Sequence, residues 1–346
     1  MHNKPAKVLL ARNMENIEST ILINQADIKK VLTMKDVVEI CDETFKGFGT
    51  GTTINPTKVT LDLGEMSNYP PYEGFMNSMP AYVGHLDAAG MKFVGGFQGE
   101  RKELGLPFLT GLIILVNPHT GSFTAVMEGA HITNMRTGAQ TAIALKYMRK
   151  SPTLRLGIYG AGMQGRTQTM AISEIFDLSE LRVYDRDPNS TLRFKEEMKN
   201  YVKGDIVIAQ SSEEAADADA VITVTPAQEK FLKEDWIKPG TIVFPMGSYQ
   251  ECEDSLLLNA DKIVVDRVAQ ALHRGALREL NAQGKITEKD IFATIGELAL
   301  GTKVLSESNE RIICIPIGTG ALDVAVAQVV LERIKAQGHS ASFSFV

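Results

Sequence analysis

The chain has 346 residues, a formal net charge of -6 and only 3 cysteines. This length is large for a single hydrophobic core and favours two domains of about 100 to 200 residues each. The acidic balance, with no basic stripe, argues against a nucleic-acid surface. The sequence therefore favours small molecules and further copies of the chain as partners.

The three cysteines, Cys41, Cys252 and Cys314, are far apart and form no C-x-x-C pair. Without a histidine cluster nearby, this spacing predicts neither a disulfide framework nor a metal site. The apolar run Val8–Ala11 near the N-terminus is too short for a signal peptide or a membrane span. We therefore expect a cytoplasmic protein.

The first part of the chain is predicted to be rich in β-strands. Alternating apolar residues predict strands over residues 20–24, 58–63, 75–83, 88–97, 108–116 and 122–128. Helical periodicity predicts helices over residues 25–32 and 34–48, and a long helix over 137–149 that residues 132–136 open.

The second part alternates between strands and helices. Strands are expected over residues 154–159, 181–184, 206–209, 220–225, 241–246, 262–266 and 311–317. Helices are expected over residues 166–176, 190–202, 212–216, 267–283, 286–300 and 320–337. Such alternation predicts an α/β domain with a doubly wound, mostly parallel sheet.

A glycine-rich turn joins the first strand and helix of this second part. Gly160, Gly162 and Gly165 match the dinucleotide fingerprint G-x-G-x-x-G. The first glycine permits a tight turn, the second lets the backbone approach a pyrophosphate, and the third allows close helix packing. The alternative is a purely structural βα turn. The predicted cofactor-binding residues here are Gly160, Ala161, Gly162, Met163, Gln164 and Gly165.

The next strand ends at Asp185, about 20 residues beyond the last glycine, where the fingerprint expects an acid. Its carboxylate would accept the ribose hydroxyls and repel a 2′-phosphate, which favours NAD(H) over NADP(H). Arg186 acts in the opposite direction, because a guanidinium can hold a phosphate through two hydrogen bonds. The alternative for Arg186 is a solvated surface charge.

Further segments follow one another in a recognisable order: Met79–Tyr82, the strand around Lys92, Gly105–Pro107, Ile132–Ala139, the glycine turn, Trp236–Gly240, Gly247, Ile295–Leu298 and Gly318–Asp323. Over most of its length the chain thereby resembles the ornithine cyclodeaminase and μ-crystallin family of cyclodeaminases, alanine dehydrogenases and imino-acid reductases. The resemblance implies a Rossmann domain, residues 133–318, inserted into a β-rich α+β domain of residues 1–132 and 319–346. It also implies a homodimer built through the β-rich domain.

The resemblance implies that cationic side chains hold a substrate carboxylate beside the nicotinamide. The matching positions are Lys92 and Arg136, with Lys58 near a third position that is usually arginine in relatives. Lysine lacks the bidentate fork of arginine, which weakens the assignment of Lys58. Asp323 matches a family position near the active site, although an acid in a first helical turn also stabilises the helix dipole. The predicted cofactor contacts also include Thr225 and Gly247.

The residues themselves give separate reasons for two of these roles. Lys92 lies in an apolar strand, where a buried ammonium needs a compensating anion, and we expect a substrate carboxylate to supply it. The alternative is an edge-strand lysine that reaches solvent. Arg136 lies near a helix start, where the helix dipole disfavours a cation, so an anionic substrate would relieve the conflict. A structural salt bridge is the alternative for Arg136.

The reaction type is predicted from one missing acid. Ornithine cyclodeaminases carry an aspartate just after the strand that here reads Thr223–Gln228. In this chain the segment Thr223–Gln228 contains no acid, and the first acid after it is Glu229. Its absence favours an amino-acid dehydrogenase or imino-acid reductase, which transfers hydride between nicotinamide and substrate Cα. The alternatives are a cyclodeaminase that converts L-ornithine to L-proline and ammonia, with Glu229 as the acid, and a non-enzymatic μ-crystallin-like binding protein.

Overall fold

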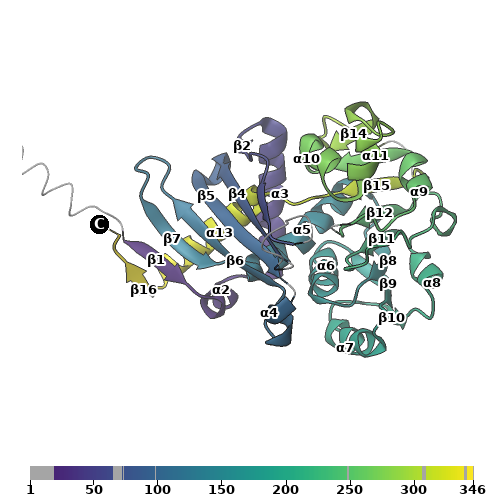
Figure 1. Ribbon diagram of the computed structural model, residues 1–346, viewed down its shortest axis with the longest axis horizontal. Helices are drawn as coiled ribbons and strands as arrows, with labels where there is room; N and C mark the ends of the chain where they lie inside the picture. Colours follow the sequence, from purple (N-terminus) through teal and green to yellow (C-terminus); the bar gives the residue numbers. More distant parts are fainter. Residues whose placement is uncertain are drawn as a thin grey trace, which may run out of the picture. The chain divides into compact units, whose positions relative to one another are not determined.

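The computed structural model describes residues 19–64, 72, 74–97, 99–247, 249–305, 309–338 and 341–345, so the run Val8–Ala11 lies outside it. Contacts divide the chain into two compact units (Figure 1). The first comprises Met1–Leu32, Ile54–Ile132 and Asp323–Val346, and the second Thr33–Thr53 and Thr133–Leu322. The expected division differs in two respects: residues 33–53 group with the second unit, and the last segment of the first unit begins at residue 323.

The first unit is built on one mixed sheet with the strand order β16-β1-β7-β6-β5-β4-β2, and β3 pairs with β4. Strands β4 to β7 form an antiparallel meander, and β1 pairs with β7 in parallel. The strands are β1 (Thr20–Ile23), β2 (Thr53–Ile54), β3 (Val59–Asp62), β4 (Gly74–Val83), β5 (Ala88–Phe97), β6 (Leu109–Val116), β7 (Phe123–Glu128) and β16 (Ala341–Phe343). Helices α2 (Gln25–Val31) and α4 (Gly99–Glu103) also belong to it, and all six strands predicted for this part are confirmed.

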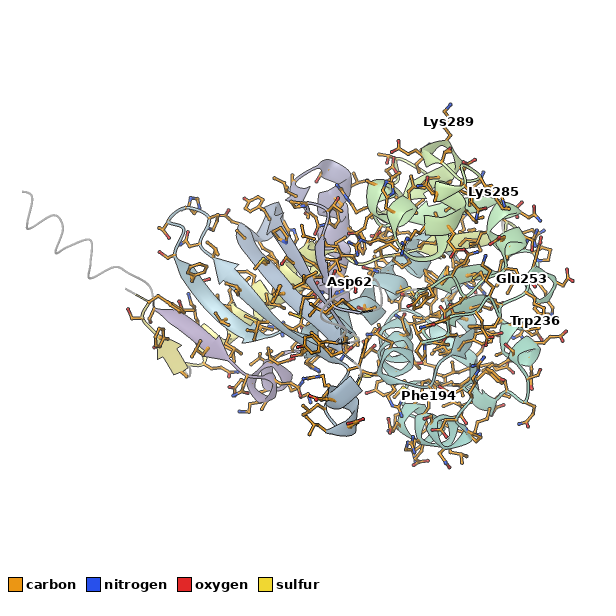
Figure 2. All side chains as sticks on the ribbon, viewed as in Figure 1. Asp62, Phe194, Trp236, Glu253, Lys285 and Lys289 are labelled. Atoms are coloured by element: carbon orange, nitrogen blue, oxygen red, sulfur yellow. The ribbon has the colours of Figure 1, made fainter. Side chains whose placement is uncertain are left out.

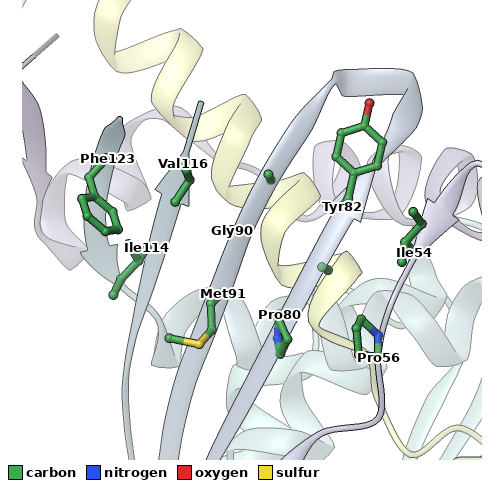
Figure 3. Close-up of a pocket in the computed structure, with 11 residues that line it drawn as sticks. Ile54, Pro56, Pro80, Tyr82, Gly90, Met91, Ile114, Val116 and Phe123 are labelled. Carbon is green, nitrogen blue, oxygen red and sulfur yellow. The ribbon is translucent and has the colours of Figure 1, made fainter. Parts of the chain in front are cut away.

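The two faces of this sheet differ, because successive side chains of a strand point to opposite sides. On β6, Ile113 and Leu115 are fully buried, whereas Leu112 is 49% exposed. The outward face carries an apolar hollow lined by side chains of β4, β5 and β6 (Figure 3). Its residues are Ile54, Pro56, Pro80, Ala81, Tyr82, Ala89, Gly90, Met91, Ile114, Val116 and Phe123.

The second unit is built on a parallel sheet with the order β10-β9-β8-β11-β12-β15-β13-β14. Its strands are β8 (Thr153–Tyr159), β9 (Asp177–Tyr184), β10 (Asp205–Ile208), β11 (Ala220–Thr223), β12 (Ile242–Pro245), β13 (Lys262–Val265), β14 (Ile291–Thr294) and β15 (Ile312–Ile315). The first five strands follow the Rossmann order, which reverses direction between β8 and β11. Ligands of such sheets bind beyond the carboxyl ends of the strands at this reversal.

The helices of the second unit are α3 (Met34–Thr50), α6 (Met163–Ser173), α7 (Pro188–Met198), α8 (Ser212–Ala216), α9 (Asp254–Leu258), α10 (Val268–His273), α11 (Arg278–Ala282) and α12 (Ile295–Leu300). Helices α5 (Ala130–Met148) and α13 (Gly320–Ala336) contain residues of both units. Within the described part of the chain, no helix has both the length and the apolar character needed to cross a membrane.

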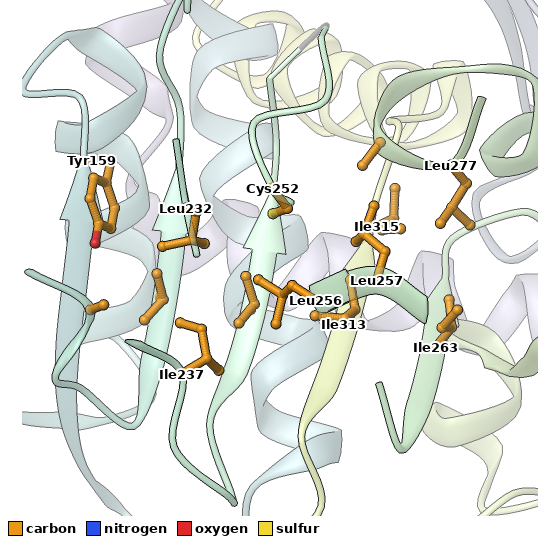
Figure 4. Packing of buried hydrophobic residues seen from close by; sticks show 14 of the residues in the cluster. Tyr159, Leu232, Ile237, Cys252, Leu256, Leu257, Ile263, Leu277, Ile313 and Ile315 are labelled. Carbon is orange, nitrogen blue, oxygen red and sulfur yellow. The ribbon is translucent and has the colours of Figure 1, made fainter. Parts of the chain in front are cut away.

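Apolar side chains between the parallel sheet and its helices form the core of this unit (Figure 4). Tyr159 of β8, Ile313 and Ile315 of β15, and Leu256 and Leu257 of α9 belong to this cluster. Each of them is at most 1% exposed. Continuous apolar strands are expected in a parallel sheet that helices cover on both faces.

The helices predicted over residues 267–283 and 286–300 are wrong as continuous elements. The first is interrupted at Gly275, whose φ of +64° is left-handed. The second contains the edge strand β14, which pairs with β13, before Thr294 caps α12. A short apolar run does not distinguish a strand from a helix by its periodicity alone.

Close packing of α3 against α12 explains why residues 33–53 group with the second unit. A Cβ at Gly49 would lie 2.5 Å from the Gly296 carbonyl oxygen, and one at Gly296 would lie 2.9 Å from the Gly49 nitrogen. The two helices therefore cross with their backbones in contact. Side chains of both units are shown in Figure 2.

Candidate active site

The glycine turn follows β8, and the space beside the backbone differs among its three glycines. Gly160 has a φ of +106°, and a Cβ there would lie 2.7 Å from the Val224 carbonyl oxygen. A Cβ at Gly165 would lie 2.2 Å from the Gly160 carbonyl oxygen and 3.3 Å from the ring of Phe194, which Figure 2 labels. A Cβ at Gly162 would meet no atom within 4 Å. The fold thus requires glycine at two positions and leaves space at the third.

Helix α6 begins directly after this space. Gly162 is its N-cap and supplies no side-chain hydrogen bond, so the first backbone N–H groups of α6 lack a side-chain cap. Exposed N–H groups at a helix N-terminus, together with the helix dipole, form an anion site. The Gln164 side chain donates to Asn134 Oδ1 on α5 (2.9 Å), two residues before Arg136. This bond ties the start of α6 to the helix that carries Arg136.

Asp185 lies at the end of β9, next to β8, and is half-buried. Its Oδ2 accepts the Ala161 N–H of the glycine turn at 2.8 Å, and its Oδ1 accepts the Asp187 N–H at 2.9 Å. The carboxylate therefore also anchors the glycine turn. The neighbouring Arg186 donates to Glu229 and forms an ion pair with it.

A buried acid that the sequence analysis missed joins the ends of β11 and β12. Glu251 is fully buried and accepts hydrogen bonds from the hydroxyls of Thr223 (2.6 Å) and Thr225 (2.5 Å). It also accepts from the backbone N–H groups of Thr225 (3.1 Å) and Gly247 (3.0 Å). Burial raises the pKa of the Glu251 carboxyl, while the bonds from Thr223 and Thr225 act in the opposite direction. Two predicted cofactor residues, Thr225 and Gly247, are thus fixed by one carboxylate.

Lys92 and Asp323 form a buried ion pair in the first unit. The Lys92 Nζ lies 2.6 Å from Asp323 Oδ2, and both side chains are fully buried. Lys92 is on the inward face of β5, and Asp323 is in the first turn of α13. The protein therefore supplies an anionic partner for Lys92, which the expectation of a compensating substrate carboxylate did not include.

Arg136 lies on α5 in the second unit and is 6% exposed. Its guanidinium is adjacent to Gly318, which has a φ of +91°, and a Cβ at Gly318 would lie 2.6 Å from Arg136 Nη1. Asp266 Oδ2 accepts the Gly318 N–H at 2.7 Å, and the Gln270 side chain donates to the Gly318 carbonyl at 3.0 Å. These hydrogen bonds fix the turn before α13. Its left-handed backbone at residue 318 and its close approach to Arg136 both require glycine.

Lys58 lies in the irregular segment between β2 and β3 and is half-buried. The described contacts join Lys92 to Asp323 in the first unit and bring Arg136 beside Gly318 in the second. No group of three or more histidine, cysteine, aspartate or glutamate residues suited to a metal ion occurs among the residues that the structure describes.

The chain is similar to several known proteins over three quarters or more of its length. It is 31% identical to the alanine dehydrogenase of Archaeoglobus fulgidus over 94% of this chain and 98% of that protein. It is 32% identical to the ketimine reductase mu-crystallin of Rattus norvegicus over 75% of this chain and 81% of that protein. The structure of the Thermococcus litoralis Delta(1)-pyrroline-2-carboxylate reductase in complex with NADH and L-proline matches with a TM-score of 0.86 and 30% identity. That match covers 94% of this chain and 100% of the reductase.

The parallel sheet, the glycine turn and these relatives define an oxidoreductase that uses a nicotinamide dinucleotide. The surroundings of the three glycines fit that cofactor. At Gly160 and Gly165 a side chain would clash with the protein backbone, whereas the space beside Gly162 is open and can admit the pyrophosphate. The chain belongs to the Ornithine cyclodeaminase/mu-crystallin family, whose sequence profile matches residues 18–338.

Proposed function

We propose that this protein transfers hydride between NAD(H) and the Cα of a small α-amino or α-imino acid. The observation that carries the proposal is the glycine turn between β8 and α6, where a Cβ at Gly162 would meet no atom within 4 Å and the backbone can approach a pyrophosphate. Lys92 and Arg136 are the cationic residues that we assign to the substrate carboxylate, the anion shared by all substrates of this class. The relatives named as an alanine dehydrogenase and a pyrroline-2-carboxylate reductase support the same class.

In this proposal the Arg136 guanidinium binds the substrate carboxylate through two N–H groups. Lys92, whose ammonium pairs with Asp323, is the second cationic residue that the family resemblance assigns to the substrate carboxylate. Asp323 fixes the position of the ammonium. The bound dinucleotide supplies or accepts the hydride, and the protein supplies orientation and charge.

The contacts of Glu229 support a dehydrogenase or reductase over a cyclodeaminase. Glu229 pairs with Arg186, the residue that follows Asp185, so its carboxylate is engaged near the predicted ribose site. A cyclodeaminase needs an acid at the distal amine of a diamino substrate. Glu229 in this pairing does not supply that acid.

We expect NADH to be oxidised when the protein receives a small α-keto acid with ammonium, or a cyclic imino acid, while L-ornithine is a poor substrate. Because the segment Thr223–Gln228 contains no acid to bind the distal amine, it offers no group that would orient ornithine for ring closure. The fall in NADH absorbance measures the reduction of the keto acid or the imino acid. NMR detects any proline that forms from ornithine. Efficient NAD-dependent conversion of ornithine to proline would reverse the preference and restore the cyclodeaminase alternative.

The proposal includes a homodimer formed through the outward face of the first unit's sheet. The apolar hollow of Figure 3 lies on this face, and Leu112 and Phe123 are each 49% exposed there. An extended exposed apolar face is typical of an interaction surface. One matching structure is an archaeal alanine dehydrogenase dimer with bound NAD, at 31% identity and a TM-score of 0.86, covering 95% of this chain and 100% of that chain.

We expect Ile114→Asp, a change within the hollow, to produce a monomer, because a charge would be buried without a partner in the dimer. Light scattering coupled to gel filtration gives the mass. The matched control is Leu192→Asp on α7, where the wild-type side chain is 59% exposed in the second unit. A dimer that survives Ile114→Asp would contradict the proposed interface.

A further inference from the structure

One ion pair crosses the end of the strand that leads into the glycine turn. Arg186 follows β9 and Glu229 lies in the segment after β11, and these two strands flank β8 in the sheet. The Arg186–Glu229 pair therefore connects the segments on either side of the end of β8, where Gly160 begins the turn. The acid at the end of β9, here Asp185, would hold the adenosine ribose of a bound dinucleotide, and Arg186 is its neighbour in the chain.

The three charged side chains in this region, Asp185, Arg186 and Glu229, differ in burial and in how firmly they are held. Asp185 is half-buried and anchored by two backbone N–H groups, so its carboxylate is fixed. Arg186 and Glu229 are 75% and 59% exposed, so their pair is solvated and can be broken by a competing ligand. The three side chains together carry two negative charges and one positive charge.

We propose that Glu229 is a specificity-determining residue that favours NAD(H) by holding the Arg186 guanidinium in an ion pair. This inference rests on the proposed use of NAD(H). A 2′-phosphate would need Arg186 as its bidentate partner, and the Glu229 carboxylate occupies that guanidinium. A 2′-hydroxyl carries no charge and needs only the Asp185 carboxylate, so Glu229 does not affect it.

Residues of two segments thus control the choice of cofactor. Asp185 acts directly on the ribose from the end of β9, whereas Glu229 acts through Arg186 from the segment after β11. Because Glu229 acts through Arg186, its effect must disappear when Arg186 is absent. This dependence distinguishes the inference from a general effect of negative charge on phosphate.

The experiment measures the dissociation constants of NADH and NADPH, by fluorescence titration of the whole protein, for wild type, Glu229→Gln, Arg186→Ala and the double variant. We expect Glu229→Gln to tighten NADPH by about threefold to tenfold, since a charged pairing partner is freed for the phosphate. NADH affinity stays within about twofold of wild type, as expected for a surface change that touches no ribose contact. The double variant shows no gain for NADPH over Arg186→Ala.

Glu196→Gln on α7 is the matched control, because Glu196 is 72% exposed and pairs with Lys199 at the C-cap of that helix. This substitution removes one exposed carboxylate of an ion pair, and we expect it to leave the ratio of the NADPH and NADH dissociation constants unchanged. An unchanged ratio in Glu229→Gln, with both cofactors still bound, overturns the role of Glu229 and leaves the proposed function intact. If Glu229→Gln still tightens NADPH binding when Arg186 is replaced by alanine, that result also overturns the role of Glu229. A wild-type protein that binds neither dinucleotide overturns the proposed function as well.

Discussion

Asp323→Ala is expected to lower the free energy of unfolding by about 3–5 kcal/mol, because it removes the carboxylate from a buried ammonium. The Lys92 Nζ lies 2.6 Å from Asp323, and neither side chain reaches solvent. We also expect loss of turnover, since the ammonium no longer has a fixed position for the substrate carboxylate. Urea denaturation gives the stability, and NADH absorbance gives the rate.

The double variant Lys92→Met/Asp323→Leu separates these two effects. Replacement of both charges by apolar side chains of similar volume is often neutral or stabilising for a buried pair. Stability is therefore expected to return towards the wild-type value, whereas activity stays lost. A stable double variant that keeps its activity would show that the pair is structural only, and would remove Lys92 and Asp323 from the proposed site.

The fold was predictable where the signal is local. Strands β4 to β7 alternate inward and outward residues along their own length, so the sequence alone indicates them. Strand β14 is short and is defined by pairing with β13, which no local pattern reveals. The grouping of residues 33–53 with the second unit depends on the contact between Gly49 and Gly296, which are far apart in the chain.

The same distinction applies to the site. The glycine turn was predictable because its three glycines and Asp185 have a fixed spacing. Glu251 carries no such signal, since its four donors come from segments that meet only at the ends of β11 and β12. The burial of Lys92 was expected from its apolar neighbours, but its partner Asp323 lies on α13, at the other end of the chain. The apolar neighbours of Lys92 thus indicate that an anion is needed, but no local pattern identifies Asp323 as that anion.

Gly162→Val is expected to weaken NADH binding by about a hundredfold, since backbone hydrogen bonds to a charged pyrophosphate are worth about 1.5–3 kcal/mol each. The free energy of unfolding is expected to change little, because a Cβ at this position meets no protein atom within 4 Å. The added side chain instead fills the space in front of the first N–H groups of α6. Fluorescence titration with NADH and thermal unfolding measure the two quantities.

Gly165→Val supplies the matched comparison within the same turn. Its Cβ would lie 2.2 Å from the Gly160 carbonyl oxygen, so the backbone of α6 would have to move away from the turn. We expect this variant to unfold or to lose stability by several times the ~1–3 kcal/mol typical of overpacking, because the clash is with backbone. Unchanged NADH affinity in a folded Gly162→Val protein would mean that the pyrophosphate does not approach Gly162. Equal destabilisation by both substitutions would mean that the open space beside Gly162 is needed for folding rather than for the cofactor.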